Sequence, residues 1–273
     1  MDAWLNGTWV RADQAMVAAA GEGCAYGFGL FETLKFSGAR ILFAEAHWRR
    51  FSESCAALGM PLPLALADFV DLCRQAIQTC RLDEGALRIQ YSKGSGHYDL
   101  LLTVKENRYV PSRYEKGFRI CMASGKRNPY ARLTYIKSGN YLENYLEKEQ
   151  ALKNHFDEAI FLNTDGHLSE GTFTNLFWVK DGVVRTPAVS CGILPGILRE
   201  KVIELIRGLG IPLEIGAFPE EELLAADEIF LTNSLMEIMP VCKLESRRFK
   251  IDHPMITQLL RKEFRDIVYT SRC

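Results

Sequence analysis

Two side chains, a lysine and a glutamate, stand in local settings that suit covalent or acid–base chemistry. Lys137 lies between an apolar pair and a glycine, directly before a predicted helix. An amine in a partly buried place can have a lowered pKa and act as a nucleophile or a base. Glu170 follows a predicted hairpin, where a buried carboxylate could pair with a protonated heterocyclic nitrogen. Taken alone, each side chain is more typical of a solvated loop.

Three segments carry groups that can bind anions. Residues 192–199 open a predicted helix, whose first N–H groups have no partner within the helix and suit a phosphate. Arg50 adds a cation, and the hydroxyls and amides of 232–240 add further donors. Each has a plain structural alternative: an ordinary helix start, a solvated arginine, and a buried strand end with Met236 and Met239 as core residues.

Composition and missing motifs exclude several other classes of function. The chain has 273 residues, 48 % of them hydrophobic, and a formal net charge of -1. These values are typical of a folded globular protein and lack the basic excess of nucleic-acid binders. The sequence has no Walker loop, no Gly-x-Ser-x-Gly and no HExxH, and its five histidines are scattered. We therefore expect no nucleic-acid partner and no metal site.

The eight cysteines and the hydrophobic pattern predict a location. No cysteine pair has CxxC spacing, and no Cys/His cluster resembles a zinc site. The N-terminal residues lack a basic start followed by an apolar core, and no apolar run approaches the roughly 20 residues that span a bilayer. We therefore expect free thiols, a cytoplasmic protein and no membrane partner.

The elements that must position these groups follow from turn residues and hydrophobic spacing. In the first part of the chain, the pattern predicts hairpins at 4–10 and 34–43, helices at 45–58 and 66–79, and strands at 86–91 and 100–104. The polar, proline-containing residues 106–117 are the best linker candidate. Beyond it, the pattern predicts strands at 118–123, 158–163, 175–180 and 228–232, and helices at 141–154, 196–209, 220–225 and from Pro254 to Val268. Hairpins outnumber βαβ units, which favours two α+β domains, 1–112 and 113–273.

Five segments in this order resemble the fold-type IV pyridoxal-phosphate enzymes, the class IV aminotransferase family. They are Tyr26-Gly-Phe-Gly-Leu-Phe-Glu-Thr33, Lys137-Ser-Gly-Asn-Tyr141, Glu170-Gly-Thr-Phe-Thr-Asn-Leu-Phe177, Gly192 to Arg199, and Thr232 to Val241. The resemblance covers nearly the whole chain. It implies a two-domain, mixed α/β fold like that of D-amino-acid aminotransferases. It also implies pyridoxal 5′-phosphate between the domains, the cofactor lysine in the second domain, and a homodimer.

The resemblance also implies roles for individual residues. Lys137 would bond covalently to the cofactor and move the proton at the substrate Cα. Glu170 would keep the pyridine nitrogen protonated, and Tyr141 would hydrogen-bond the phenolic oxygen. The implied phosphate site comprises Arg50, the amides of Ile197 and Leu198, and Ser234. The implied substrate site comprises Phe31, Thr33, Lys93, and the amides around Leu235 and Met236.

Three positions depart from the family pattern. Leu198 replaces a threonine, so a hydroxyl contact to phosphate is lost while the backbone amide remains. Lys93 stands where many relatives have an arginine, so it would offer a point charge instead of a fork. Phe31 replaces the tyrosine of D-amino-acid aminotransferases, which argues against that substrate. Cys24 and Cys191 adjoin two of the matching segments, and we expect both near the cofactor cleft.

The resemblance is greatest to the 4-amino-4-deoxychorismate lyases of folate biosynthesis, which release 4-aminobenzoate and pyruvate. An aminotransferase acting on branched-chain or D-amino acids is the alternative, because it would use the same residues. A non-catalytic relative is the third possibility. The retained Lys137 and Glu170 argue against it.

Overall fold

The computed structural model describes residues 2–251 and 255–270 and divides into two compact units. Unit 1 comprises the chain up to Arg108 together with Ile136–Tyr141, and unit 2 comprises the rest. The segment with Lys137 therefore groups with unit 1, whereas the expected division placed it in the second domain. The reason is strand pairing, because Leu30 and Ser138 form an antiparallel bridge beside the Gly139 N–H, which donates to the Gly29 carbonyl at 2.8 Å.

Unit 1 is built on a six-stranded antiparallel sheet with the order β2-β1-β6-β5-β3-β4. Its strands are β1 (Asp2–Leu5), β2 (Thr8–Arg11), β3 (Gly29–Ser37), β4 (Arg40–Ile41), β5 (Glu84–Lys93) and β6 (Tyr98–Glu106). The predicted hairpin turns form as expected: Asn6 and Gly7 both have positive φ, as does Gly38. The hairpin predictions are confirmed, although β3 begins earlier than expected.

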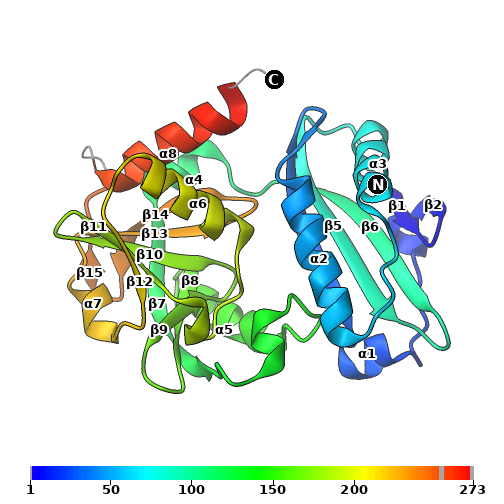
Figure 1. Ribbon diagram of the computed structural model, residues 1–273, viewed down its shortest axis with the longest axis horizontal. Helices are drawn as coiled ribbons and strands as arrows, with labels where there is room; N and C mark the ends of the chain where they lie inside the picture. The colour runs from blue at the N-terminus through cyan, green and yellow to red at the C-terminus, as the bar shows by residue number, and fades with distance from the viewer. Residues whose placement is uncertain (1, 252–254, 271–273) are drawn as a thin grey trace. The chain divides into compact units, whose positions relative to one another are not determined.

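Two helices cover one face of this sheet (Figure 1) and close its core. They are α2 (Ala44–Leu58) and α3 (Leu66–Thr79), and both confirm the helices predicted from hydrophobic spacing. Phe51 of α2 and Phe69 of α3 are buried against sheet residues such as Phe36. The remaining helical elements of unit 1 are α1 (Glu22–Tyr26) and the 3-10 turn η1 (Ala12–Gln14).

Unit 2 is built on a nine-stranded mixed sheet with the order β12-β11-β10-β13-β14-β7-β8-β9, with β15 beside β14. Its strands are β7 (Phe118–Arg127), β8 (Glu158–Asn163), β9 (Leu168–Gly171), β10 (Asn175–Lys180), β11 (Val183–Pro187), β12 (Leu213–Gly216), β13 (Glu228–Asn233), β14 (Glu237–Leu244) and β15 (Arg247–Arg248). Strand β7 lies between β14 and β8 and runs parallel to both. The strands predicted for this half are confirmed.

The helices of unit 2 match the predictions except near the expected linker. They are α4 (Pro111–Lys116), α5 (Leu142–Lys153), α6 (Ile197–Gly208), α7 (Glu220–Leu224) and α8 (Ile256–Arg265), with 3-10 turns at Arg132–Tyr135 and Val189–Cys191 and a π turn at Asp266–Thr270. Helix α4 lies inside the predicted linker, because a proline in the first turn is compatible with a helix. In the described ranges, no helix is long and apolar enough to cross a membrane.

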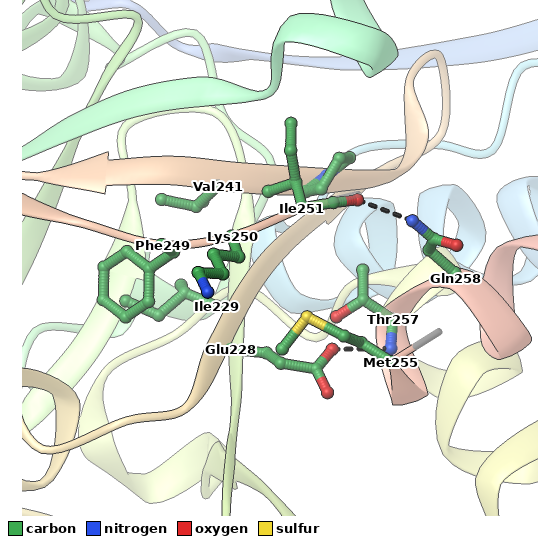
Figure 2. Close-up of a pocket in the computed structure, with 10 residues that line it drawn as sticks. Glu228, Ile229, Val241, Phe249, Lys250, Ile251, Met255, Thr257 and Gln258 are labelled. Carbon is green, nitrogen blue, oxygen red and sulfur yellow. Dashed lines mark hydrogen bonds between the residues drawn. The ribbon is translucent and has the colours of Figure 1, made fainter. Parts of the chain in front are cut away.

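Helix α8 is fixed by a buried carboxylate from β13. Glu228 accepts the N–H of Ile256 at 3.0 Å and that of Thr257 at 2.8 Å, as the close-up in Figure 2 illustrates for Thr257. The predicted start at Pro254 lies outside the described residues. The cavity drawn in Figure 2 has a volume of about 10 Å³, room for about one water molecule, so it cannot hold a cofactor.

Candidate active site

In unit 1, the pairing of segment 136–141 with β3 places Lys137 beside two aromatic rings. The Phe31 N–H donates to the Lys137 carbonyl at 3.0 Å. The Lys137 Nζ then lies 4.4 Å from the centre of the Phe31 ring and 5.2 Å from that of Tyr141. The two rings meet edge to face with their centres 5.2 Å apart. The structure therefore brings three of the predicted site residues together.

Arg88 joins this group, and the sequence reasoning missed it. It lies on β5 directly opposite Thr33, and its guanidinium carbon is 4.2 Å from the centre of the Phe31 ring. Its Nε donates to the Gln90 side chain at 3.2 Å, and burial lowers its pKa. An arginine held over an aromatic ring can bind a carboxylate with two parallel hydrogen bonds. The signal in the sequence was a lone cation inside an apolar strand.

Lys93, the other predicted substrate-binding cation, has an acidic partner. Its Nζ lies 2.7 Å from Glu22 Oε1, and this hydrogen bond raises the pKa of Lys93. A substrate carboxylate would have to replace Glu22 at this amine. Of the two cysteines expected near the cleft, Cys24 is exposed and Cys191 is buried.

Arg50 is held by a second group of unit 1 residues that the sequence reasoning did not single out. Its Nε and Nη2 donate to the two oxygens of Glu32 at 2.8 and 2.7 Å. His47 Nδ1 lies 2.7 Å from Glu32 Oε2. Burial opposes ionisation of Glu32, but the charge of Arg50 and the hydrogen bonds from His47 and Arg50 outweigh it and hold the pKa of Glu32 far below its ordinary value.

In unit 2, Glu170 of β9 is a buried carboxylate with three donors. Its Oε1 lies 3.3 Å from Nη2 of Arg127, and its Oε2 accepts the Asn175 amide at 3.2 Å and the Leu194 N–H at 3.0 Å. Arg127 was also missed by the sequence reasoning. Its guanidinium lies 4.4 Å from the centre of the Phe161 ring and donates to Asn144 at 3.1 Å. These contacts suit an ionised carboxylate of fixed orientation.

The start of α6 is tied to Glu170 through Asn175. The Asn175 amide donates both to Glu170 and to the Leu194 carbonyl, the latter at 3.0 Å. Gly196 precedes the helix, and a Cβ there would lie 1.8 Å from Asn175 Oδ1, so only glycine fits. Ile197 and Leu198 are the first two helical residues, whose N–H groups have no acceptor within the helix. Their chemistry fits an anion.

The segment after β13 is organised by Asn233. Its Oδ1 accepts the N–H groups of Leu235 at 3.0 Å and Met236 at 2.9 Å, and its amide donates to Phe173. The two amides expected to bind a substrate carboxylate are thus donors to a side chain of the same turn. Tyr114 donates to the Met236 carbonyl at 2.9 Å. The role expected of Ser234 stays a prediction.

The donor sets of the two units can be compared with what a phosphorylated pyridine aldehyde requires. Unit 1 supplies an amine beside aromatic rings and a forked cation, and unit 2 supplies a buried carboxylate and a helix start. These are the groups that hold an aldehyde, a ring and a phosphate. Within residues 2–251 and 255–270, no cluster of three His, Cys, Asp or Glu side chains could hold a metal ion.

Comparisons with known proteins agree with this chemistry. The model of the amino-transferase class IV family matches residues 29–244. A Methanocaldococcus jannaschii protein, provisionally named a branched-chain-amino-acid aminotransferase, is 32 % identical, with 98 % of this chain and 96 % of the relative covered. Aminodeoxychorismate lyase of Bacillus subtilis is 25 % identical, with 97 % of this chain and 96 % of the relative covered.

A solved structure of a member of this family has a similar fold. The branched-chain amino acid aminotransferase of Escherichia coli has a TM-score of 0.88 and 26 % identity, covering 97 % of this chain and 93 % of that one. The expected mixed α/β fold is confirmed by this likeness. The family match spans most of both units, from β3 to the end of β14. The chain therefore belongs to the class IV aminotransferase family.

Proposed function

We propose that this protein is a 4-amino-4-deoxychorismate lyase of folate biosynthesis. It belongs to a family whose members use pyridoxal 5′-phosphate, and its residues fit that cofactor. The observation that carries the proposal is the Phe31 ring, which has the Lys137 amine and the Arg88 guanidinium within 4.4 and 4.2 Å of its centre. An amine-handling group and a carboxylate-binding cation beside one apolar ring suit a cyclic amino acid. In aminodeoxychorismate, the ring separates the amine from a carboxylate.

The chain's own residues would then divide the work as follows. The cofactor, when bound, supplies an electron sink for the charge left at the carbon that carries the amine. Lys137 would hold the cofactor covalently through its amine and, when that amine is free, would remove the proton from that carbon. Arg88 and Phe31 orient the substrate ring. Cleavage of the neighbouring C–O bond would leave its electron pair on the enol oxygen of pyruvate, which takes up a proton to give pyruvate, and formation of the aromatic ring of 4-aminobenzoate would supply much of the driving force.

The cofactor roles that the family resemblance implies are part of this proposal. Tyr141 would hydrogen-bond the phenolic oxygen, and Glu170 would hold the proton of the pyridine nitrogen. Arg50, Ser234 and the amides of Ile197 and Leu198 would bind the phosphate. Thr33, opposite Arg88, would line the substrate site. The assignments of Lys93, Leu235 and Met236 to the substrate need the exchange of their present partners.

The alternative is an aminotransferase, and the 32 % identity to the Methanocaldococcus jannaschii relative favours it. In both reactions, Lys137 would first remove the proton from the substrate carbon that carries the amino group. An aminotransferase would return the proton to the cofactor side and pass the amino group to a keto acid. The lyase would release pyruvate with no keto acid present.

One assay separates the two reactions. The purified protein is incubated with aminodeoxychorismate, and pyruvate and 4-aminobenzoate are measured with and without 2-oxoglutarate. We expect both products in equal amounts without 2-oxoglutarate. Absence of pyruvate, together with amino transfer from a branched-chain amino acid to 2-oxoglutarate, would establish the alternative.

Borohydride reduction tests Lys137 independently of the substrate. Reduction of the protein loaded with pyridoxal 5′-phosphate should fix the cofactor on the peptide that contains Lys137, and Lys137→Ala should abolish the adduct. An adduct that persists on another lysine would overturn the assignment. Lys148, which contacts Glu158, offers a matched control, because its replacement should leave the adduct in place.

We further propose that the protein forms a homodimer. We also propose that it works in a reducing, cytoplasmic compartment. Helix α5 exposes 67 % of Leu142, 55 % of Tyr145 and 57 % of Leu146, which lie three and four residues apart on one helix face. The seven cysteines in the described part of the chain are all free thiols. Light scattering should give the mass of a dimer, and Leu146→Glu should shift it toward the monomer. A wild-type protein that is monomeric at micromolar concentration would contradict the homodimer proposal.

A further inference from the structure

The carboxylate of Glu32 and the guanidinium of Arg50 form a forked pair inside unit 1. Glu32 lies on β3 and Arg50 on α2, so the pair ties the sheet to the helix that covers it. Both hydrogen bonds are short, 2.8 and 2.7 Å, and only 1 % of the Glu32 side chain and 12 % of the Arg50 side chain are exposed. Two parallel charge-assisted bonds fix the plane of the guanidinium as well as its position.

His47, one turn before Arg50 on α2, completes the arrangement. Its Nδ1 lies 2.7 Å from Glu32 Oε2. Burial lowers the pKa of His47 despite the opposing effect of Glu32, so the ring is neutral. Because an ionised carboxylate only accepts hydrogen bonds, the Nδ1 of this neutral ring carries the proton and donates. Glu32 is thus held by hydrogen bonds from two side chains, His47 and Arg50.

This arrangement decides which edge of Arg50 can meet an anion. The Nε–H and one hydrogen of Nη2 point at Glu32. An anion bound by Arg50 must therefore use the edge formed by Nη1 and the second hydrogen of Nη2, which again has the geometry of a fork. A phosphate oxygen pair fits such an edge.

The neighbouring arginine on the same helix provides a contrast. Arg49 pairs with Glu45 through one contact of 3.2 Å, and both side chains are mostly exposed. An exposed pair of this kind fixes little, because water and salt screen it and both side chains remain mobile. The buried fork at Arg50 is a different device, although the two arginines are adjacent in the sequence.

We propose that Glu32, anchored by His47, is a positioning residue that presents Arg50 to the phosphate group of the cofactor. The inference rests on the proposed phosphate role of Arg50. Glu32 itself touches neither phosphate nor substrate in this assignment. Its effect is therefore specific to ligands that carry the phosphate, and a purely structural role would not have that specificity.

Binding of two cofactor forms tests the proposal without any measurement of activity. Apoprotein is titrated with pyridoxal 5′-phosphate and with pyridoxal, which lacks the phosphate, and binding is followed by absorbance. Glu32→Gln should weaken binding of the phosphorylated form about ten- to a hundredfold, the value of one charge-assisted hydrogen bond, and leave pyridoxal binding unchanged. Glu45→Gln is the matched control and should change neither. Equal weakening of both ligands by Glu32→Gln, or weakening of neither, would overturn the proposal.

Arg50→Met separates this inference from the proposed function. If Arg50→Met keeps the full preference for the phosphorylated form, the proposed phosphate role of Arg50 is wrong, and so is the positioning role of Glu32 that depends on it. If Arg50→Met loses the preference and Glu32→Gln keeps it, only the positioning role is wrong. The double variant should match Arg50→Met, because Glu32 acts through that arginine.

A second substitution keeps the test valid if Glu32→Gln does not fold. Glu32→Asp retains the charge and withdraws the carboxylate by one methylene, so the fork cannot form in its present place. Unchanged pyridoxal binding will show that this variant is folded. It should lose the phosphate preference in the same direction, and a full preference would overturn the positioning role.

Discussion

The buried pair of Arg127 and Glu170 makes a quantitative prediction about unit 2. Only 11 % of the Arg127 side chain and 7 % of the Glu170 side chain are exposed, and their closest atoms are 3.3 Å apart. Glu170→Gln removes the negative charge and leaves the arginine buried. The second acidic neighbour of Arg127 is Glu143, which lies 3.6 Å away. Glu143 is mostly exposed, so it would offset little of the buried positive charge.

The expected loss follows from these contacts. Removing one partner of a buried ion pair costs about 3–5 kcal/mol, because the remaining charge stays desolvated. The new amide keeps an oxygen that can accept from Asn175 and Leu194, so we expect the lower end, about 3 kcal/mol. The double variant Arg127→Met/Glu170→Gln buries no unpaired charge and should lose less than Glu170→Gln alone.

Denaturation of the apoprotein in urea provides the assay. Trp178 is fully buried in unit 2 and should report the transition by fluorescence. Glu143→Gln is the control and should change the free energy of unfolding by less than about 0.5 kcal/mol. A Glu170→Gln variant as stable as the wild type, or a double variant that loses at least as much as Glu170→Gln, would refute the reasoning.

Three further outcomes are expected. Burial holds the folded-state pKa of His47 below the ordinary 6.5, so the unfolded chain binds more protons than the folded chain below that pH. The free energy of unfolding should therefore fall from about pH 6.5 toward pH 5. His47→Gln should make this pH dependence weaker in urea titrations. Pulsed alkylation followed by mass spectrometry should label exposed Cys24 in the folded protein and buried Cys73, whose pKa burial raises to about 12, only after unfolding; equal rates would contradict this. Gly196→Ala should displace the Asn175 amide and lower the free energy of unfolding by about 1–3 kcal/mol, and an unchanged melting temperature would argue against the close contact.

Local structure was largely predictable where turn residues and spacing punctuate the chain. Helix α3 begins and ends at the predicted residues, and α2 differs by one residue at its start. Two features of the structure were not visible in the local pattern, one because it depends on pairing over a long sequence separation and one because a proline stands in the segment. No local pattern announces that Ser138 bridges to Leu30 of β3, yet this contact assigns the Lys137 segment to unit 1. The polar residues of the expected linker likewise concealed α4, whose proline suits a first helical turn.

The candidate site was predictable only where a resemblance pointed to it. Lys137, Tyr141 and Phe31 were predicted by the resemblance, and the structure places them together. Arg88 and Arg127 were missed, because a lone arginine near or in a strand carries no sign of what faces it. Strand register supplies the missing information, since it places Arg88 opposite Thr33. Buried arginines whose partners come from distant strands or helices are therefore harder to predict than residues that lie in a recognisable motif.

The lyase and the aminotransferase reactions both need Lys137 to remove a proton, and they differ only after that step. The residues around Phe31, which would bind the substrate, therefore distinguish the two reactions better than Lys137 does. A branched-chain amino acid carries an apolar side chain and has no second carboxylate for Arg88 to bind. Aminodeoxychorismate carries a ring carboxylate and a leaving group next to the reacting carbon. Loss of the Arg88 charge should therefore raise the KM for aminodeoxychorismate, by about ten- to a hundredfold if one charge-assisted contact is lost, and leave binding of a branched-chain substrate little changed. The choice between elimination and transfer thus depends on which substrate this cation and ring hold beside Lys137, since the proton-moving amine is common to both reactions.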